Sequence, residues 1–169
     1  RFTVEIPSPH PSLWQRLNQR VAATPLAARL FSRVFHHIDN AAFRVSGGRV
    51  SVASLLIGLP VVTLTTIGAK SGVARSVPLI GIPDGQKFVL IASNWGQARH
   101  PAWYYNLRAR PRVALAWAGR TGAYTAREAS GDEYAAYWER AVGLYAGYAA
   151  YKQRAGERAI PIVVLEPQV

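Results

Sequence analysis

A short glycine-bounded turn, Gly68 to Gly72, carries the first residues whose types and spacing could do chemistry. Lys70 lies inside it and Arg75 follows it, so both cations and the N–H groups of the turn can face one anionic group. The turn is not a nucleotide-binding P-loop, because Ala69 stands where that motif has a glycine before the lysine. Pro78 follows closely and predicts a strand, so no helix dipole assists. A plain β-turn with exposed basic side chains is the competing interpretation.

A second polar and aromatic segment runs from Ala92 to Val113, "ASNWGQARHPAWYYNLRARPRV". Gly96 would let a flat ligand approach the backbone, and the aromatic rings offer stacking faces. For Trp103 taken alone, packing in a core is the favoured interpretation. The candidate ligand-binding residues of this segment are Ser93, Asn94, Trp95, Gly96, Arg99, His100, Trp103 and Asn106.

Tyr145, Tyr148 and Tyr151 recur at every third position in a segment with helical character. This spacing places three phenols along one side of a helix, where they could line the wall of a cavity. Core packing is the default explanation for such a stripe. However, three buried hydroxyls would each need a polar partner, which favours the edge of a cavity.

Several other kinds of site are excluded by residue type. The sequence contains no cysteine, so it offers no disulfide, thiolate ligand or cysteine nucleophile. His36 and His37 are adjacent on a predicted helix and diverge by about 100°, so they cannot chelate one metal together. No H-E-x-x-H set and no G-x-S-x-G elbow occurs. We expect no metal site and no hydrolase triad.

The net charge of +11 comes from 20 Lys and Arg residues against 9 Asp and Glu residues, and nearly all of the cations are arginines. Such a surface attracts polyanions, and arginine suits phosphate and carboxylate groups in particular. The candidate partners are nucleic acid, anionic lipid or a multiply charged small molecule. With 50% hydrophobic and 17% charged residues, the chain has a globular composition.

Runs of period two predict the elements that must position these residues. We expect strands at 61–67, 74–82, 87–93, 112–118, 121–129 and 160–167. A short helix is predicted between Pro101 and Pro111, and a long helix over 130–155 with a Ser130–Glu133 capping box. Successive strands joined by tight turns are typical of antiparallel pairing. The sequence therefore predicts an α+β fold in which six antiparallel strands form a small closed or half-closed barrel.

The N-terminal part is predicted to be a helical segment that precedes the barrel. Residues 11–46 show helical spacing, are divided at Thr24-Pro25 and carry a basic face, which fits a solvated surface or peripheral contact with a membrane. The uncharged stretch 51–69 is broken by Gly58 and Pro60, so a loop feeding a buried strand is favoured over a membrane span. We expect a helical segment, 1–48, packed on a barrel domain, 49–169. No signal-peptide pattern is found, and we expect a trimmed chain from the cytoplasm.

Two motifs in order, "LTTIGAKSGVARSVPL" and "VLIASNWGQARHPAWYYNLRARPRV", resemble the deazaflavin-dependent nitroreductase family. The likeness runs from about Pro60 to Pro167 and includes the tyrosine segment and the closing "IPIVVLEP". It implies a split β-barrel of the FMN-binding type. It also implies an enzyme that transfers a hydride from reduced coenzyme F(420), an 8-hydroxy-5-deazaflavin, to a quinone, nitroaromatic or similar flat acceptor.

The resemblance also implies roles for particular residues. The turn would bind the phosphate and acidic tail of the coenzyme, and the second segment would line its ring. The acceptor would face Tyr145, Tyr148 and Tyr151, with Tyr148 as the best proton or hydrogen-bond donor and Ser93 as the second candidate. The implied cofactor-binding residues are Lys70, Ser71, Gly72, Arg75, Pro78, Leu79, Ala92, Ser93, Asn94, Trp95, Gly96, Pro101, Trp103 and Asn106.

The sequence departs from the family pattern at two places. Many members have S-K-G-G where this chain has Ser93 to Gly96, and a second basic residue where it has Ala69. Related barrels bind FMN, haem or fatty acids, so a binding protein without this turnover is the alternative, with FMN as the less favoured cofactor. Nucleic acid is not an expected partner, because no nucleic-acid-binding motif accompanies the charge. A dimer is compatible with the sequence.

Overall fold

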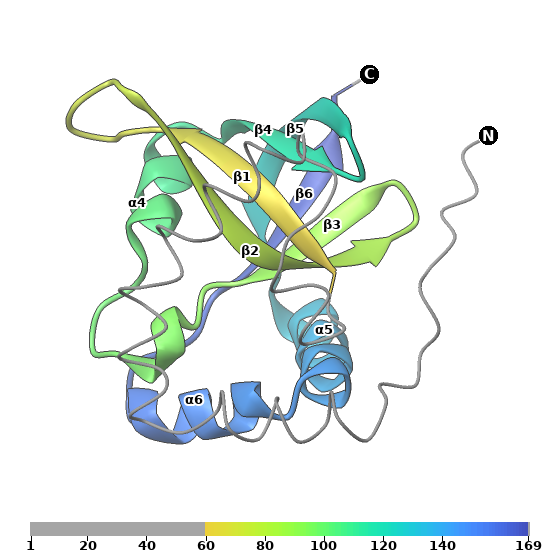
Figure 1. Ribbon diagram of the computed structural model, residues 1–169. Helices are drawn as coiled ribbons and strands as arrows, with labels where there is room; N and C mark the ends of the chain where they lie inside the picture. The colour runs from red at the N-terminus through yellow and green to blue at the C-terminus, as the bar shows by residue number, and fades with distance from the viewer. Residues whose placement is uncertain (1–59, 169) are drawn as a thin grey trace.

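The computed structural model describes residues 60–168, and these form a closed antiparallel barrel of six strands with three α-helices around it (Figure 1). The order of strands around the barrel is β1-β2-β3-β6-β5-β4, and β4 closes it by pairing with β1. The predicted α+β class and closed barrel are confirmed. The strands are β1 (Val61–Ile67), β2 (Ala74–Asp84), β3 (Lys87–Ile91), β4 (Arg112–Trp117), β5 (Arg120–Glu128) and β6 (Ile162–Pro167).

Tight turns join β1 to β2, β2 to β3 and β4 to β5, as the sequence predicts. In the turn between β1 and β2, the N–H of Gly68 donates to the carbonyl of Val73 at 2.9 Å. The turn between β4 and β5 places Ala118 and Gly119 at φ 50° and 76°, a left-handed pair that matches the twist of a hairpin. The strand ends shift by a few residues from the predicted bounds, which is the usual uncertainty of pattern-based boundaries.

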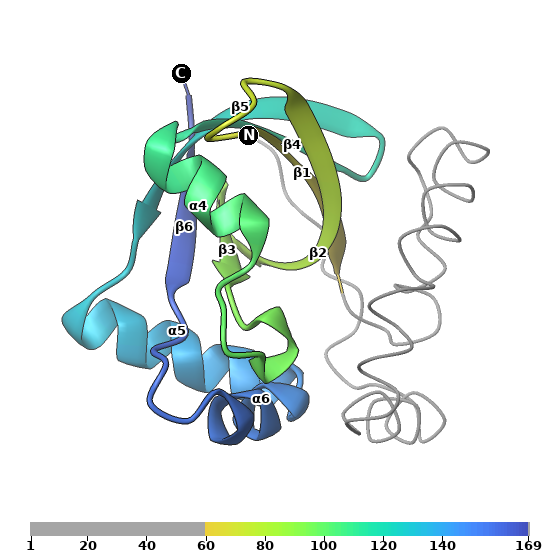
Figure 2. The ribbon, with the colours of Figure 1, turned by 90° about the vertical axis from the view of Figure 1, so that its left-hand side faces the viewer.

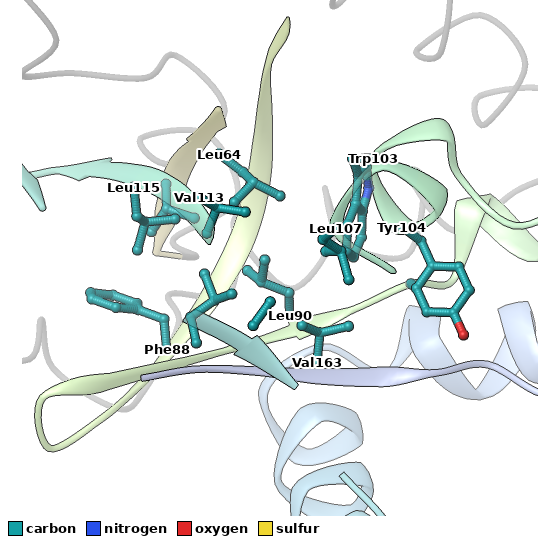
Figure 3. Close-up of a cluster of buried hydrophobic side chains, with 13 residues drawn as sticks. Leu64, Phe88, Leu90, Trp103, Tyr104, Leu107, Val113, Leu115 and Val163 are labelled. Carbon is teal, nitrogen blue, oxygen red and sulfur yellow. The ribbon is translucent and has the colours of Figure 1, made fainter. Parts of the chain in front are cut away.

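Strands β3 and β6 separate two hydrophobic cores, because both of their faces are buried. Phe88 and Leu90 of β3 point into the barrel, where they meet Val163 of β6 and residues of β1 and β4 (Figure 3). The intervening Val89 and Ile91 point outward into a second cluster. A strand that is buried on both faces has consecutive apolar residues in its sequence, and "KFVLI" contains such a run.

The three α-helices are α4 (Ala102–Ala109), α5 (Gly131–Leu144) and α6 (Gly147–Ala155). Helix α4 contributes Trp103 and Leu107 to the barrel core, whereas α5 and α6 lie below the barrel and cover the second cluster (Figure 2). The predicted short helix between Pro101 and Pro111 is thereby confirmed.

The predicted single helix over 130–155 is wrong. Helix α5 ends at Leu144, and Tyr145 adopts extended backbone angles of φ −144° and ψ 101° before α6 begins at Gly147. The ring of Tyr145 folds back over Gly147 so closely that a Cβ there would overlap it. Glycine also disfavours a continuous helix, and its lack of a side chain permits this return of the ring. Apolar periodicity alone does not reveal such a break.

The predicted capping box is also wrong. Within residues 60–168, Ser130 precedes α5 in extended conformation without a capping hydrogen bond from its side chain. Glu133 instead forms a two-pronged pair with Arg127 of β5, with N–O distances of 2.6 and 2.7 Å. A bidentate guanidinium–carboxylate contact is stronger than the hydrogen bond that the box would supply.

The predicted helices of residues 11–46 and the proposed boundary at 48/49 lie outside the described residues. The favoured interpretation of 51–69 is supported in its described part, where Val61–Ile67 is a strand. Within residues 60–168, none of the helices is both long and apolar enough to cross a membrane.

Candidate functional site

The basic turn, residues 68–72, is held by backbone hydrogen bonds, and its polar side chains extend into solvent. The N–H of Gly72 donates to the carbonyl of Gly68 at 2.9 Å, and Gly72 has a φ of 69°, which suits glycine. The side chains of Lys70, Ser71 and Arg75 are exposed. The turn therefore presents two cations and a hydroxyl to solvent. Of these three groups, Ser71 Oγ also accepts a 3.3 Å hydrogen bond from the N–H of Val73 within the turn.

Gly68 brings two of these groups together. A Cβ at this position would lie 2.5 Å from Ser71 Oγ and 3.7 Å from Arg75 Nε. The lack of a side chain at Gly68 therefore lets the hydroxyl of Ser71 lie against the backbone there, with the guanidinium of Arg75 close by. Hydroxyl, guanidinium and ammonium donors are the groups that recognise phosphate, so the residues present fit the phosphate and acidic tail of a deazaflavin coenzyme.

Asn106 supports the turn rather than lying free for a ligand. Its side chain is only 8% exposed, its Oδ1 accepts from the N–H of Ala69 at 3.0 Å, and its Nδ2 donates to Thr66 Oγ1 at 3.0 Å. Arg110, which sequence reasoning missed, donates from Nη1 to the carbonyl of Gly68 at 2.8 Å. Asn106 lies within α4 and Arg110 is its C-cap residue, so this helix fixes the position of the turn.

The segment that follows β3 contains a strained turn. Asn94, Trp95 and Gly96 have successive φ values of 47°, 58° and 74°, all in the left-handed region. For each residue with a side chain this conformation costs about 1–2 kcal/mol. The amide of Asn94 donates to the carbonyl of Arg99 at 2.8 Å, which closes the segment on itself. A strained backbone that is held in this way marks a candidate functional site.

Gly96 is required by contact with α6. A Cβ on Gly96 would lie 2.6 Å from the carbonyl oxygen of Tyr151 and 2.8 Å from Cβ of Arg154. The sequence predicts that a flat ligand approaches the backbone at Gly96. On the side where a Cβ would point, helix α6 makes the close approach. The ring of Trp95 meets that of Tyr151 edge-on, with centroids 5.9 Å apart.

Gly96→Ala is expected to lower the free energy of unfolding by about 1 kcal/mol or more beyond the loss caused by Gly85→Ala. Both positions have positive φ, 74° and 59°, so both variants carry the same backbone strain. Only the new Cβ at residue 96 meets neighbouring atoms, and such overpacking costs typically about 1–3 kcal/mol. Urea unfolding of the two variants measures the difference. Equal losses would show that α6 does not restrict this turn.

The remaining predicted ring-lining residues are distributed over three elements. Pro78 and Leu79 are half-buried in β2, opposite Thr63 and Val62 of β1. Ala92 and Ser93 are buried just after β3, and Pro101 precedes α4 as its N-cap residue. Trp103 is 7% exposed in the barrel core, which supports the packing interpretation for this residue.

The three tyrosines cluster although only Tyr148 and Tyr151 share a helix, α6, and Tyr145 lies before it. The hydroxyls of Tyr145 and Tyr151 are hydrogen-bonded at 3.0 Å, and the ring of Tyr148 meets the other two edge-on at 5.4 and 6.0 Å. None is more than 4% exposed, and burial raises the pKa of all three phenols. The phenols therefore stay protonated near neutral pH. Their burial also supports core packing, the interpretation that competes with a role at the acceptor.

The three candidate groups are connected on one side of the molecule. In Figure 1 the turn after β1, helix α4, the segment at 94–96 and helix α6 follow one another along that side. Asn106 links α4 to the turn, and Trp95 links the segment to α6. No group of three or more His, Asp or Glu side chains within the described part of the chain is placed to hold a metal ion.

Comparison with known proteins identifies the family of the chain. The model of the F420H(2)-dependent quinone reductase family matches residues 36–167. This chain belongs to that family. It is therefore an oxidoreductase that uses coenzyme F(420), as the resemblance of its motifs implies, and the predicted enzyme class and cofactor are confirmed.

Individual relatives agree with the family assignment. An F420H(2)-dependent quinone reductase of Mycobacterium tuberculosis is 31% identical over 131 residues, which cover 76% of this chain and 87% of that protein. The solved structure of an F420-H2 dependent reductase, FDR-A, is 39% identical with a TM-score of 0.59, covering 63% of this chain and 94% of the other. A solved structure described as a domain-swapped dimer is 34% identical with a TM-score of 0.61, covering 75% and 95%.

Sequence reasoning missed two arginines of the site, Arg110 and Arg158. Each donates to backbone carbonyls of a candidate segment, Arg110 across 42 positions of sequence and Arg158 across as many as 66. In a chain with 20 basic residues, nothing in their local spacing sets them apart. Only the closure of the barrel brings them to the site.

Proposed function

We propose that this chain reduces quinones with a hydride from reduced coenzyme F(420), and that the turn at 68–72 anchors the phosphate and acidic tail of the coenzyme. The observation that carries the proposal is the exposed group of Lys70, Ser71 and Arg75 on the turn, where Ser71 and Arg75 come together at Gly68. Membership of the quinone reductase family supports the acceptor class. A relative of M. tuberculosis that is named as such a reductase supports it as well.

The chemistry asks little of the protein beyond alignment and charge stabilisation. When bound, the reduced coenzyme supplies the hydride. A quinone that takes up a hydride carries a negative charge on one oxygen and needs one proton to become the hydroquinone. Residues of 92–96 and β2 would orient the ring, and the neighbouring helices would exclude water, which strengthens hydrogen bonds to the developing charge.

Two hydroxyls are proposed as donors to that oxygen, Tyr148 first and Ser93 second. Burial raises the pKa of Tyr148, so its phenol keeps its proton and acts mainly as a hydrogen-bond donor to the negative oxygen. Ser93 is buried at the end of β3, next to the strained turn. Solvent would complete the transfer of the proton.

Parallel titrations test the binding half of this proposal. Coenzyme F(420), FMN and haem are each titrated into the full chain at low and high ionic strength. We expect the deazaflavin to bind most tightly and salt to weaken it, because the exposed cations of the turn are screened within about 10 Å at 0.1 M salt. Binding of FMN with equal affinity, or an affinity for the deazaflavin that does not change with salt, would contradict the assignment of the turn.

Turnover tests the acceptor half. Oxidation of the reduced coenzyme is followed with a water-soluble benzoquinone and with a nitrobenzene derivative. We expect the larger kcat/KM for the benzoquinone. Faster turnover of the nitro compound would change the proposed acceptor class without affecting the coenzyme.

Two statements about the protein's surroundings are also proposals. A dimer is supported by the 34% identical structure described as a domain-swapped dimer, and light scattering of the full chain measures it. A monomer mass would exclude it. A cytoplasmic location is a prediction from the sequence, and so is peripheral membrane contact through the basic helices predicted for residues 11–46, which lie outside the described residues. Flotation of the full chain with anionic vesicles tests the membrane contact.

A further inference from the structure

The guanidinium of Arg158, in the connection between α6 and β6, contacts the segment that follows β3 at several points. Nη2 donates to the carbonyl of Ser93 at 2.6 Å, and Nε donates to the carbonyl of Gln97 at 2.8 Å. Nη1 donates to Nδ1 of His100 at 3.1 Å and reaches the carbonyl of Ala92 at 3.5 Å. The half-buried guanidinium of Arg158 thus uses Nε, Nη1 and Nη2 to bind one segment of nine residues.

The two shortest of these bonds bracket the left-handed turn. Ser93 precedes the three residues with positive φ and Gln97 follows them. The carbonyl of Ser93 also accepts from the N–H of Gly96 at 3.0 Å, so the guanidinium binds the same oxygen that closes the turn. Because the donors of arginine are fixed in one plane, they set the spacing of the two carbonyls.

His100 extends this arrangement to α4. Its Nδ1 accepts from Arg158, so the neutral ring carries its proton on Nε2. Burial and the neighbouring guanidinium lower the pKa of His100, which favours this neutral form. The ring lies 4.9 Å from that of Tyr104 in α4, the helix whose Asn106 holds the basic turn. His100 therefore connects Arg158 to the helix that holds the basic turn.

We infer that Arg158 is a positioning residue that fixes 93–97 in its left-handed turn and so places Ser93 and Trp95 for the deazaflavin ring. The role of Arg158 in placing residues for the cofactor rests on the proposed function, whereas its role in holding the backbone of the turn does not. Arg158 acts through the backbone of the turn, whereas Lys70 and Arg75 are proposed to contact the ligand directly. Its action depends on the geometry of the fork, and a lysine at this position keeps the charge but loses the fork.

Hydrogen exchange of the protein without ligand tests the backbone claim. The variants are Arg158→Lys, Arg158→Gln and, as the control, Arg99→Gln, which removes an exposed arginine from the same segment. We expect exchange in a peptide covering 93–100 to accelerate by about tenfold in both Arg158 variants, because the turn opens when its carbonyls lose these bonds. Peptides from β1 and β6 should exchange as in the wild type. The control should leave all three peptides unchanged.

Titration with oxidised coenzyme F(420) tests the cofactor claim. We expect Kd to rise about three- to tenfold in both Arg158 variants, and less in Arg99→Gln. Wild-type exchange and wild-type affinity in Arg158→Lys would overturn the inference, because charge alone would then suffice. Faster exchange throughout the barrel would overturn it as well, since Arg158 would be a general element of stability. If the wild-type protein bound no deazaflavin, the proposed function would fail, and the exchange result would still decide the role of Arg158.

Discussion

The double variant Lys70→Ala/Arg75→Ala is expected to bind coenzyme F(420) about ten to a hundred times more weakly than the wild type, at an unchanged melting temperature. The weaker binding follows from the loss of charge-assisted hydrogen bonds worth roughly 1.5–3 kcal/mol together, after allowance for solvent around exposed side chains. Fluorescence titration of the coenzyme measures Kd, and thermal unfolding of the free protein measures stability.

Stability should survive because the turn does not depend on these two side chains. Its shape is held by the backbone bonds of Gly68, by Asn106 of α4, whose Oδ1 accepts from the N–H of Ala69, and by Arg110, which donates to the carbonyl of Gly68. Lys70 and Arg75 are exposed, and substitution of exposed residues usually changes stability by no more than about 0.5 kcal/mol. A fall in affinity can therefore be attributed to lost ligand contacts.

The matched control is Lys87→Ala/Arg120→Ala, which removes the same charge from the opposite end of the barrel. Lys87 and Arg120 lie at the hairpins that join β2 to β3 and β4 to β5, whereas the basic turn joins the other ends of β1 and β2. A loss of affinity in the control as large as in the double variant would show that overall charge, not the turn, attracts the coenzyme. Unchanged affinity in Lys70→Ala/Arg75→Ala would make the turn an ordinary β-turn.

The barrel could be predicted because its information is local. Each strand shows period two or a continuous apolar run, and each hairpin has a glycine where positive φ is required, such as Gly85 and Gly119. The helix break at Tyr145 could not be predicted in this way. It depends on a ring that folds back over Gly147, and the apolar spacing on both sides continues as if the helix were unbroken.

The sequence predicts which residues form the candidate site, but not the contacts that hold them in place. The side chains of the turn are exposed, and the three tyrosines cluster, although a break between two helices brings them together and not one helix face. Asn106, in contrast, was assigned to the cofactor and instead holds the turn through Thr66 and Ala69. Partners that lie 37 and 40 positions away are set by the register of the barrel, which residue spacing does not encode.

Tyr148→Phe is expected to lower kcat with a quinone acceptor by about tenfold or more while leaving coenzyme affinity nearly unchanged. A preorganised donor in a dry site contributes typically about 10²–10³ in rate, and less where water can replace it. The effect should fall on kcat rather than on binding, because the donor acts on charge that develops in the transition state. Stopped-flow oxidation of the reduced, protein-bound coenzyme measures the step.

The substitution removes one oxygen and keeps the ring, so the cluster should stay packed. Tyr148 is not a member of the hydroxyl pair between Tyr145 and Tyr151, which the variant leaves intact. Tyr124→Phe is the matched control, since Tyr124 packs against Phe88 in the other core, away from the tyrosine cluster. It should oxidise the coenzyme at the wild-type rate. A wild-type rate in Tyr148→Phe as well would mean that the buried rings are core packing. The donor to the quinone oxygen would then be Ser93, whose hydroxyl lies at the end of β3 beside the strained turn, or solvent.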